Sequence, residues 1–299
     1  MAYHKPVLLH ESIEGLNIKP KGIYVDLTFG GGGHSREVLN KLGKHGRLVA
    51  FDQDPQAKAN VPDDQRIIFV GANFRYLRNF LRYHAIDQVN GIMADLGISS
   101  HQIDSPERGF SFSSDQALDM RMDLRGKKRA SQVLNQYSQE DLERIFWQYG
   151  ELNNAKAIAR AVVHARGERE LGTTGDLKEA LMKFIPRSFP SKFLARVFQA
   201  LRIEVNQEVD ALGEMLLQTA GCMAPGGRLV VITYHSVEDR LVKNYMRSGN
   251  LEGIIHKDFY GRAETPWRVV NRSVIRPSRQ EIETNKRARS AKLRIAEKK

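Results

Sequence analysis

Short apolar runs alternate with amphipathic segments through the first hundred residues of the chain. Each run has a suitable length for one buried strand. Helical patterns begin near His34 and near Tyr76, and Pro55 suits the first turn of a further helix. Apolar strands separated by helices are typical of a parallel sheet that is covered on both faces. The predicted strands lie at residues 22–26, 47–52, 66–70 and 90–95.

The pattern changes between residues 101 and 203, where no strong strand signal is present. Ser138 and Asp141 fit a capping box before an apolar-periodic helix. Thr173 and Asp176 fit the start of another helix. We therefore expect a mostly helical insertion, and we expect it to lie on the substrate side of the protein.

Strand and helix signals resume after this insertion. A turn is predicted at residues 224–227 and an apolar strand at 228–233. Before the turn, the spacing of apolar residues predicts one face of a helix, formed by Val205, Val209, Leu212 and Leu216. After the strand, a second helix is predicted from Val237, Leu241 and Tyr245. The sheet is thus interrupted and then completed. The predicted sheet domain comprises residues 1–100 and 204–299, and the helical insertion comprises residues 101–203.

The charge of the chain indicates a polyanionic partner. Lys and Arg number 46 against 35 Asp and Glu, a formal net charge of +11, and clustered cations bind phosphates by displacing counterions. Residues 285–299 are rich in Lys and Arg, so we expect a surface arm that contacts phosphates. The alternative is an arm docked on the protein through Leu293 and Ile295.

The remaining composition narrows the class of protein. A single cysteine, Cys222, excludes an internal disulfide and a cysteine-rich zinc site. No group of His, Cys and Asp has metal-ligand spacing, so no metal is predicted. No signal segment or membrane-length apolar stretch is present, which favours a cytoplasmic protein without a membrane partner. The oligomeric state stays open, and a homodimer is one of the possibilities.

A glycine-rich segment joins the first predicted strand to the first helix. Residues 30–33 are all glycine, and glycines at this position allow a tight turn and a close approach of a ligand to the backbone. Asp52 ends the second strand, about where an acid contacts ribose hydroxyls in nucleotide-binding folds. Together they predict a nucleotide-like ligand, and the alternative is a glycine turn that only aids packing.

Two features discriminate between nucleotide-like ligands. Ser35 stands where a dinucleotide-binding segment usually has its third glycine, which disfavours a nicotinamide oxidoreductase. Asp26, Asp52 and Asp95 all end sheet strands, at the edge where ligands bind. A pyrophosphate gains nothing from these acids, whereas the sulfonium and ammonium of S-adenosyl-methionine suit them. The predicted ligand is therefore S-adenosyl-methionine, although each acid has a helix-capping role as its alternative.

Further candidates follow the later strands. Phe74 suits either the face of an adenine or the core. Asp95 is a candidate catalytic residue, because amino-group methyltransferases often have an Asp or Asn after this strand, although the two prolines and the aromatic residue that usually follow are absent here. His235 is a second candidate, which either orients substrate and moves a proton or caps the next helix. Four aromatic residues are candidates for stacking a target base, namely Phe110, Phe112, Tyr234 and Trp267.

Motifs spread over nearly the whole chain carry a family resemblance. They are YHKPVLL at 3–9, DLTFGGGGHS at 26–35, DQDP at 52–55, DLGISSHQ at 95–102, RGFSF at 108–112, LDMRM at 118–122, FQALRI at 198–203, HSVEDR at 235–240 and RSAKLR at 289–294. In this order they resemble the bacterial ribosomal RNA small-subunit methyltransferase H family.

This resemblance implies an α/β class I methyltransferase (Rossmann-like) sheet with an inserted, mostly helical second domain. It implies methylation of the exocyclic amine of a cytosine in the decoding region of 16S ribosomal RNA, with S-adenosyl-methionine as cofactor. The rival hypothesis is a noncatalytic RNA-binding assembly factor that retains a cofactor fold. The cofactor contacts that the resemblance implies are Gly32, Gly33, His34, Asp52, Phe74, Asp95 and Gln102.

Overall fold

The strands in the described part of the chain form one sheet. Most of the residues between the fourth and fifth strands form a second, helical unit. The computed structural model describes residues 6–271 and 273–299, which divide into two units. Unit 1 comprises Met1–Gly97 and Val209–Lys299, and unit 2 comprises Ile98–Glu208. Tyr3, His4 and Lys5, which begin the first stretch of the resemblance, lie outside the described residues.

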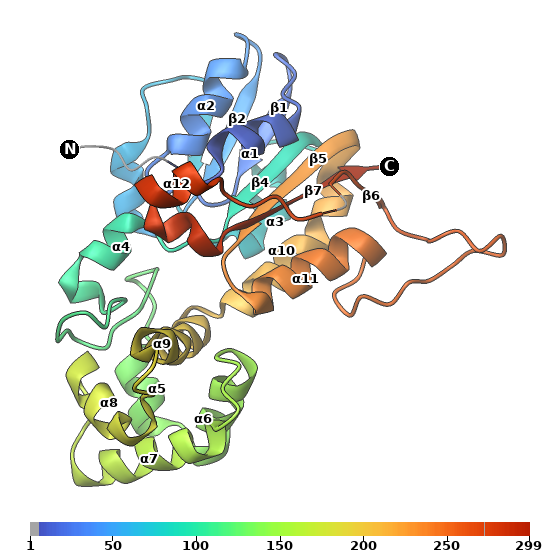
Figure 1. The fold of residues 1–299 in the computed structure, drawn as a ribbon. Helices are drawn as coiled ribbons and strands as arrows, with labels where there is room; N and C mark the ends of the chain where they lie inside the picture. Colours follow the sequence, from blue (N-terminus) through green and yellow to red (C-terminus); the bar gives the residue numbers. More distant parts are fainter. Residues whose placement is uncertain (1–5, 272) are drawn as a thin grey trace. The chain divides into compact units, whose positions relative to one another are not determined.

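Unit 1 contains a seven-stranded sheet with the order β3-β2-β1-β4-β5-β7-β6 (Figure 1). β1 to β5 run parallel, whereas β7 is antiparallel to both β5 and β6. The direction in which strands are added reverses between β1 and β4, and ligands bind at such a reversal, beyond the carboxyl ends of the strands. The strands are β1 Ile23–Asp26, β2 Arg47–Phe51, β3 Ile67–Val70, β4 Val89–Asp95, β5 Met223–Thr233, β6 Trp267–Val269 and β7 Lys292–Lys298.

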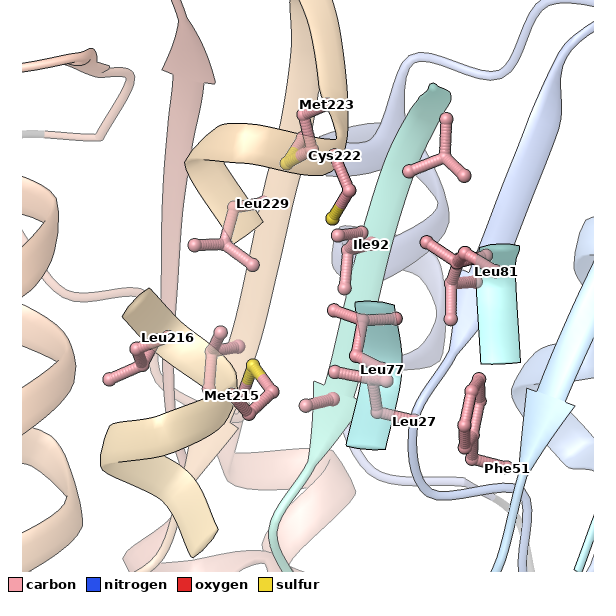
Figure 2. Close-up of a cluster of buried hydrophobic side chains, with 14 of the residues drawn as sticks. Leu27, Phe51, Leu77, Leu81, Ile92, Met215, Leu216, Cys222, Met223 and Leu229 are labelled. Carbon is pink, nitrogen blue, oxygen red and sulfur yellow. The ribbon is translucent and has the colours of Figure 1, made fainter. Parts of the chain in front are cut away.

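Helices cover both faces of this sheet, because nearly continuous apolar strands bury side chains on each side. The first face packs against α3, α10 and α11, and the second face packs against α1, α2 and η5. Figure 2 shows part of the first cluster, where side chains of α3 and α10 meet those of the strands. The helices of unit 1 are α1 Leu9–Leu16, α2 Gly33–Lys41, η1 Pro55–Asn60, η2 Phe74–Tyr76, α3 Leu77–Tyr83, α10 Glu208–Cys222, α11 Ser236–Ser248, α12 Arg279–Thr284 and η5 Lys286–Ser290.

Unit 2 is helical, as the absence of strand signals predicted. Its α6 begins after Ser138, whose side chain accepts a hydrogen bond from the Asp141 backbone, and α8 begins with a capping box of Thr173 and Asp176. No helix in the described part of the chain has the length and apolar character needed to cross a membrane. The helices are α4 Ser100–Asp104, η3 Pro106–Arg108, α5 Ala130–Gln136, α6 Gln139–Gln148, α7 Ala155–Glu168, α8 Thr174–Ala180, η4 Met182–Phe184 and α9 Pro190–Asn206.

The five predicted strands are all present, but two local predictions are wrong. Val205 lies on α9, not on the helix of Val209, because Gln207 adopts a left-handed conformation with φ 51° that separates the two helices. The predicted turn at 224–227 is part of β5, whose pairing with β4 shifts register between Val89 and Gly91. Gly226 supplies a φ of 77° within this irregular stretch.

The predicted surface arm at the C-terminus is also wrong, because the end of the chain is an inner strand of the sheet. β7 pairs with β5 from Arg228 to Thr233. Leu293 is fully buried and Ile295 nearly so. On the opposite side of β7, Arg294 donates to Asp239 of α11 at 2.7 Å, and the Lys292 Nζ lies 3.2 Å from the same carboxylate. The alternative of a docked arm is therefore correct. Two of its cations, Lys292 and Arg294, form ion pairs within the protein.

Burial would raise the pKa of Asp239, but the hydrogen bonds and charges of Arg294 and Lys292 outweigh this and hold it below its usual value. This lowered pKa means that the ion pair stabilises the fold above the ordinary titration range of an aspartate. The pair thus fastens β7 to α11 at neutral pH.

Leu293→Ala should lower the free energy of unfolding by about 2–5 kcal/mol, because it opens a cavity between the sheet and its covering helices. Arg289→Ala is the matched control: its side chain is exposed, so its effect should stay within about 0.5 kcal/mol. Urea unfolding followed by circular dichroism measures both. Equal, small effects would mean that the tail is not an integral strand.

Candidate functional site

The loop between β1 and α2 is shaped by close contacts at its glycines. Gly32 has a φ of 74°, and a Cβ atom there would lie 2.7 Å from the Phe29 ring. A Cβ atom on Gly33 would lie 2.1 Å from Pro6, so the N-terminal segment packs directly on the start of α2. Both glycines are therefore required by the fold, whatever they bind. Their roles as cofactor contacts stay predictions.

Asp26 at the end of β1 holds this loop in place. Its carboxylate accepts a hydrogen bond from the Ser35 hydroxyl at 2.6 Å and another from the Thr28 backbone at 3.1 Å. Burial raises its pKa, although these bonds and the nearby His34 oppose the effect. Both oxygens of this buried acid are thus engaged in tying the strand to the loop and the helix.

Asp52 directly follows β2 and faces the same loop. One carboxylate oxygen accepts from the Gly30 backbone at 2.7 Å and the other from the Asp54 backbone at 2.8 Å. Burial, with smaller repulsions from Asp54 and Asp26, raises the pKa of Asp52 to about 6. The backbone amides fix the orientation of the carboxylate, and each oxygen keeps a lone pair for a ligand hydroxyl.

Asp95 at the end of β4 is held from three directions. Its backbone amide donates to the Thr28 hydroxyl at 2.7 Å, and its carboxylate accepts from the Gly97 backbone at 3.1 Å. The Tyr234 side chain is a hydrogen-bond partner of the same carboxylate. Burial raises the pKa of Asp95, while His34 and Tyr234 oppose the increase.

The contact with Tyr234 depends on Gly97. A Cβ atom at Gly97 would lie 2.8–3.1 Å from the Tyr234 ring and hydroxyl, so a larger residue would displace the tyrosine. Burial and the neighbouring Asp95 raise the pKa of Tyr234 far above its usual value, so this side chain keeps its proton as a donor. Sequence reasoning considered Tyr234 only as a stacking residue and missed its contact with Asp95. A glycine two residues after the acid was the available signal.

His34 and Phe74 lie at the same edge of the sheet. His34 is buried at the start of α2, with its Nε2 3.1 Å from the Val7 carbonyl, and it is among the groups that oppose the raised pKa of Asp26 and of Asp95. Phe74 begins η2, after Asn73, whose side chain donates to Gln53 beside Asp52 at 2.7 Å. Phe74 is half-buried and packs on the core, so one part of the ring remains accessible.

Two other candidates have structural partners. His235 is the N-cap of α11: its Nδ1 accepts from the Glu238 backbone at 3.4 Å, and its Nε2 lies 2.9 Å from the Glu238 carboxylate. This geometry favours the capping alternative over proton transfer. Gln102 lies in unit 2, where it is buried and its side chain accepts from the Ser99 backbone at 3.2 Å. Its role as a cofactor contact stays a prediction.

The aromatic candidates differ in their surroundings. Trp267 is buried in the core of unit 1 and packs edge-on against Tyr245, which removes it as a stacking platform. In unit 2, Phe110 is buried and Phe112 packs edge-on against Phe198. Of these aromatic candidates, Trp267 is therefore excluded, and Phe110 and Phe112 pack within unit 2.

Comparison with known proteins decides the family. The family model described as the MraW methylase family matches residues 1–299. The chain belongs to this family. It is 56% identical over 299 residues to a protein of Bacteroides thetaiotaomicron named ribosomal RNA small subunit methyltransferase H, covering 100% of this chain and 98% of the relative.

A relative with the same name from Flavobacterium johnsoniae is 53% identical over 298 residues, again covering 100% of this chain and 98% of the relative. A solved rRNA methylase from Streptococcus thermophilus aligns over 100% of this chain and 99% of its own, with 11% identity and a TM-score of 0.42. The present chain is thus a methylase. It has the class I methyltransferase fold, and S-adenosyl-methionine is its cofactor.

The residues of this methylase fit such a cofactor. Asp26, Asp52 and Asp95 each have a raised pKa, and no Lys or Arg is among the groups that perturb them. Desolvated carboxylates without a Lys or Arg partner favour a cationic ligand, because its charge repays part of their desolvation. Asp52 is placed for the ribose hydroxyls and Phe74 for the adenine, and both assignments stay proposals.

Asp52→Ala should weaken binding of S-adenosyl-methionine roughly ten- to a hundredfold, because a hydrogen bond to a charged group contributes about 1.5–3 kcal/mol. Calorimetric titration measures the affinity, and a preserved circular dichroism spectrum establishes that the variant is folded. Asp63→Ala, another aspartate of unit 1, is the control. Unchanged affinity in a folded Asp52→Ala variant would refute the assignment.

Proposed function

We propose that this methylase transfers a methyl group from S-adenosyl-methionine to the exocyclic N4 amine of a cytosine in the decoding region of 16S ribosomal RNA. The observation that carries the proposal is the match over the whole chain to relatives named for ribosomal RNA of the small subunit. The acidic strand-end site supports the cofactor, and the formal charge of +11 supports an RNA substrate. The cytosine and its N4 position rest on the family resemblance.

The bound cofactor supplies a methyl group already activated on a sulfonium. A cytosine amine is a weak nucleophile, because its lone pair is delocalised into the ring. The main task of the protein is thus to hold the amine in line with the methyl group, and positioning of this kind lowers a barrier substantially. Asp52 and the loop that it holds fix one side of this geometry.

Asp95 is proposed to act on the amine or to place the cofactor beside it. Its carboxylate lies at the strand reversal, and its raised pKa makes it a better acceptor for an amine hydrogen. Thr28, Gly97 and Tyr234 restrict its movement. Accepting a hydrogen bond from the amine would direct the nitrogen lone pair toward the methyl group.

The proposed substrate is the RNA of an assembled small subunit in the cytoplasm, not a free nucleoside. Chemistry on a base requires that it be unstacked, and a protein with a large positive charge can contact the surrounding phosphates. Unit 2 is proposed to contribute to this contact with RNA.

The direct experiment incubates small subunits from a strain lacking this protein with labelled cofactor and then digests the RNA to nucleosides. We expect label in 4-N-methylated cytidine. Label in another nucleoside, or in protein, would overturn the proposed specificity. Tight cofactor binding with no transfer would favour the rival, a noncatalytic assembly factor.

Asp95→Asn should reduce methyl transfer to small subunits at least about a hundredfold. Its melting temperature should be equal or higher, because the raised pKa means that folding disfavours the ionised acid, which the amide does not carry. Single-turnover kinetics and calorimetry would separate a defect in chemistry from one in cofactor affinity. Full turnover in this variant would remove Asp95 from the mechanism.

A further inference from the structure

The connection between α11 and β6 exposes aromatic side chains. Phe259 is 97% exposed, Tyr260 79% and Ile254 57%. Figure 1 shows this connection extending away from the sheet as a long loop. Large apolar side chains that a protein leaves in solvent together indicate an interaction site.

The tip that carries these aromatic residues is an ordered hairpin, comprising residues 256–264. Its arms pair at Lys257 and Ala263 and through a bond from the Glu264 backbone to the His256 carbonyl at 2.9 Å. The Asp258 carboxylate accepts from the backbones of Tyr260 and Arg262 at 2.9 and 2.8 Å and closes the turn. Specific hydrogen bonds therefore hold the tip in the conformation that exposes its aromatic side chains.

Cations accompany the aromatic side chains. The Arg262 guanidinium lies over the Tyr260 ring, 5.9 Å from its centroid, and Phe259 contacts Tyr260 edge-on. At the base of the connection, a small cavity of about 130 Å³ is lined on one side by Lys243 and Arg247 of α11. Both side chains are exposed, and neither forms an ion pair within the described part of the chain.

This surface lies away from the acidic site of unit 1. β6 runs in the same direction as β5, and Trp267 at its start pairs with Lys298 beyond the Arg228 end of β5. The hairpin therefore joins the sheet at the edge opposite to Asp95, which pairs with Ile232. A seven-residue strand such as β4 separates the two edges by roughly 20 Å.

We propose that the 256–264 hairpin, together with Lys243 and Arg247 on α11 at the base of the connection, binds single-stranded RNA. An unpaired base stacks on Phe259 or Tyr260, and phosphates further along the same strand contact the two cations. This inference rests on the proposed function and extends it: the substrate has a second contact, far from the methylated base. A free nucleoside or a short hairpin around the target base cannot reach both contacts.

RNA explains the combination better than other partners do. Aromatic rings beside Arg and Lys are the features that bind unpaired bases and their backbone. A membrane surface would also attract cations and aromatic side chains, but the turn carries the acid Asp258 and the arms carry Glu264, which would oppose insertion. Anionic vesicles therefore serve as the competing probe.

The test compares the double variant Phe259→Ala/Tyr260→Ala with the wild-type chain in methyl transfer to small subunits. We expect KM to rise about five- to a hundredfold, with kcat and cofactor affinity unchanged because the acidic site is intact. Tyr83→Ala is the matched control, since Tyr83 is 81% exposed on α3, and it should leave KM unchanged. The melting temperature of all three proteins should agree.

A second measurement addresses the cations. For binding to poly(U), Lys243→Ala/Arg247→Ala should reduce the slope of log affinity against log salt by roughly 1.4, the value for two phosphates on a single strand.

An unchanged KM in the aromatic variant, while the wild-type chain methylates subunits, would overturn this inference and leave the proposed function intact. Loss of binding to phosphatidylglycerol vesicles, with KM unchanged, would assign the hairpin to membranes. No methylation by the wild-type chain would instead count against the proposed function, and poly(U) binding would then decide on the hairpin.

Discussion

One buried and two half-buried carboxylates at the same edge of a parallel sheet are the constraint on which the site depends. Asp26, Asp52 and Asp95 end neighbouring strands, so the topology brings their negative charges together. Backbone amides and hydroxyls hold each carboxylate, but no Lys or Arg relieves its desolvation. The fold maintains this unfavourable charge because its core is large, and a cationic cofactor is the ligand that gains most from it.

The rest of unit 1 supports this edge from a distance. The glycine loop reaches Asp52 because Gly32 and Gly33 admit Phe29 and Pro6 at distances that a side chain would not allow. The C-terminal strand completes the sheet beside β5, and the Asp239 ion pairs fasten it to α11. The acidic residues are therefore held by the sheet and its covering helices, and the exposed hairpin joins the sheet at the opposite edge. Substrate contacts of the kind proposed for the hairpin would leave the acidic edge unchanged.

The sequence predicted the features that depend on local patterns. Apolar runs gave β1 to β5 and the strand-end acids, because a buried strand must be nearly continuous in apolar residues. The C-terminal strand was missed because the charges of Lys292 and Arg294 masked the alternation of Leu293 and Ile295. The capping of α11 by His235 is a local contact with Glu238 and was one of the two predicted alternatives. The contact of Tyr234 with Asp95, in contrast, depends on β5 lying beside β4. Single-sequence periodicity does not contain that information, and His34 and Gln102 came only from resemblance.

Proton exchange on cofactor binding tests the acidic site most directly. The pKa of Asp52 is raised to about 6, and a cationic cofactor should favour its ionised form. Calorimetric titrations in buffers of different ionisation enthalpy should therefore show release of about half a proton per cofactor near that pH, and Asp52→Asn should abolish this part of the release. Tight binding without proton exchange at any pH around this pKa would contradict the account of a carboxylate edge that binds S-adenosyl-methionine through its charge.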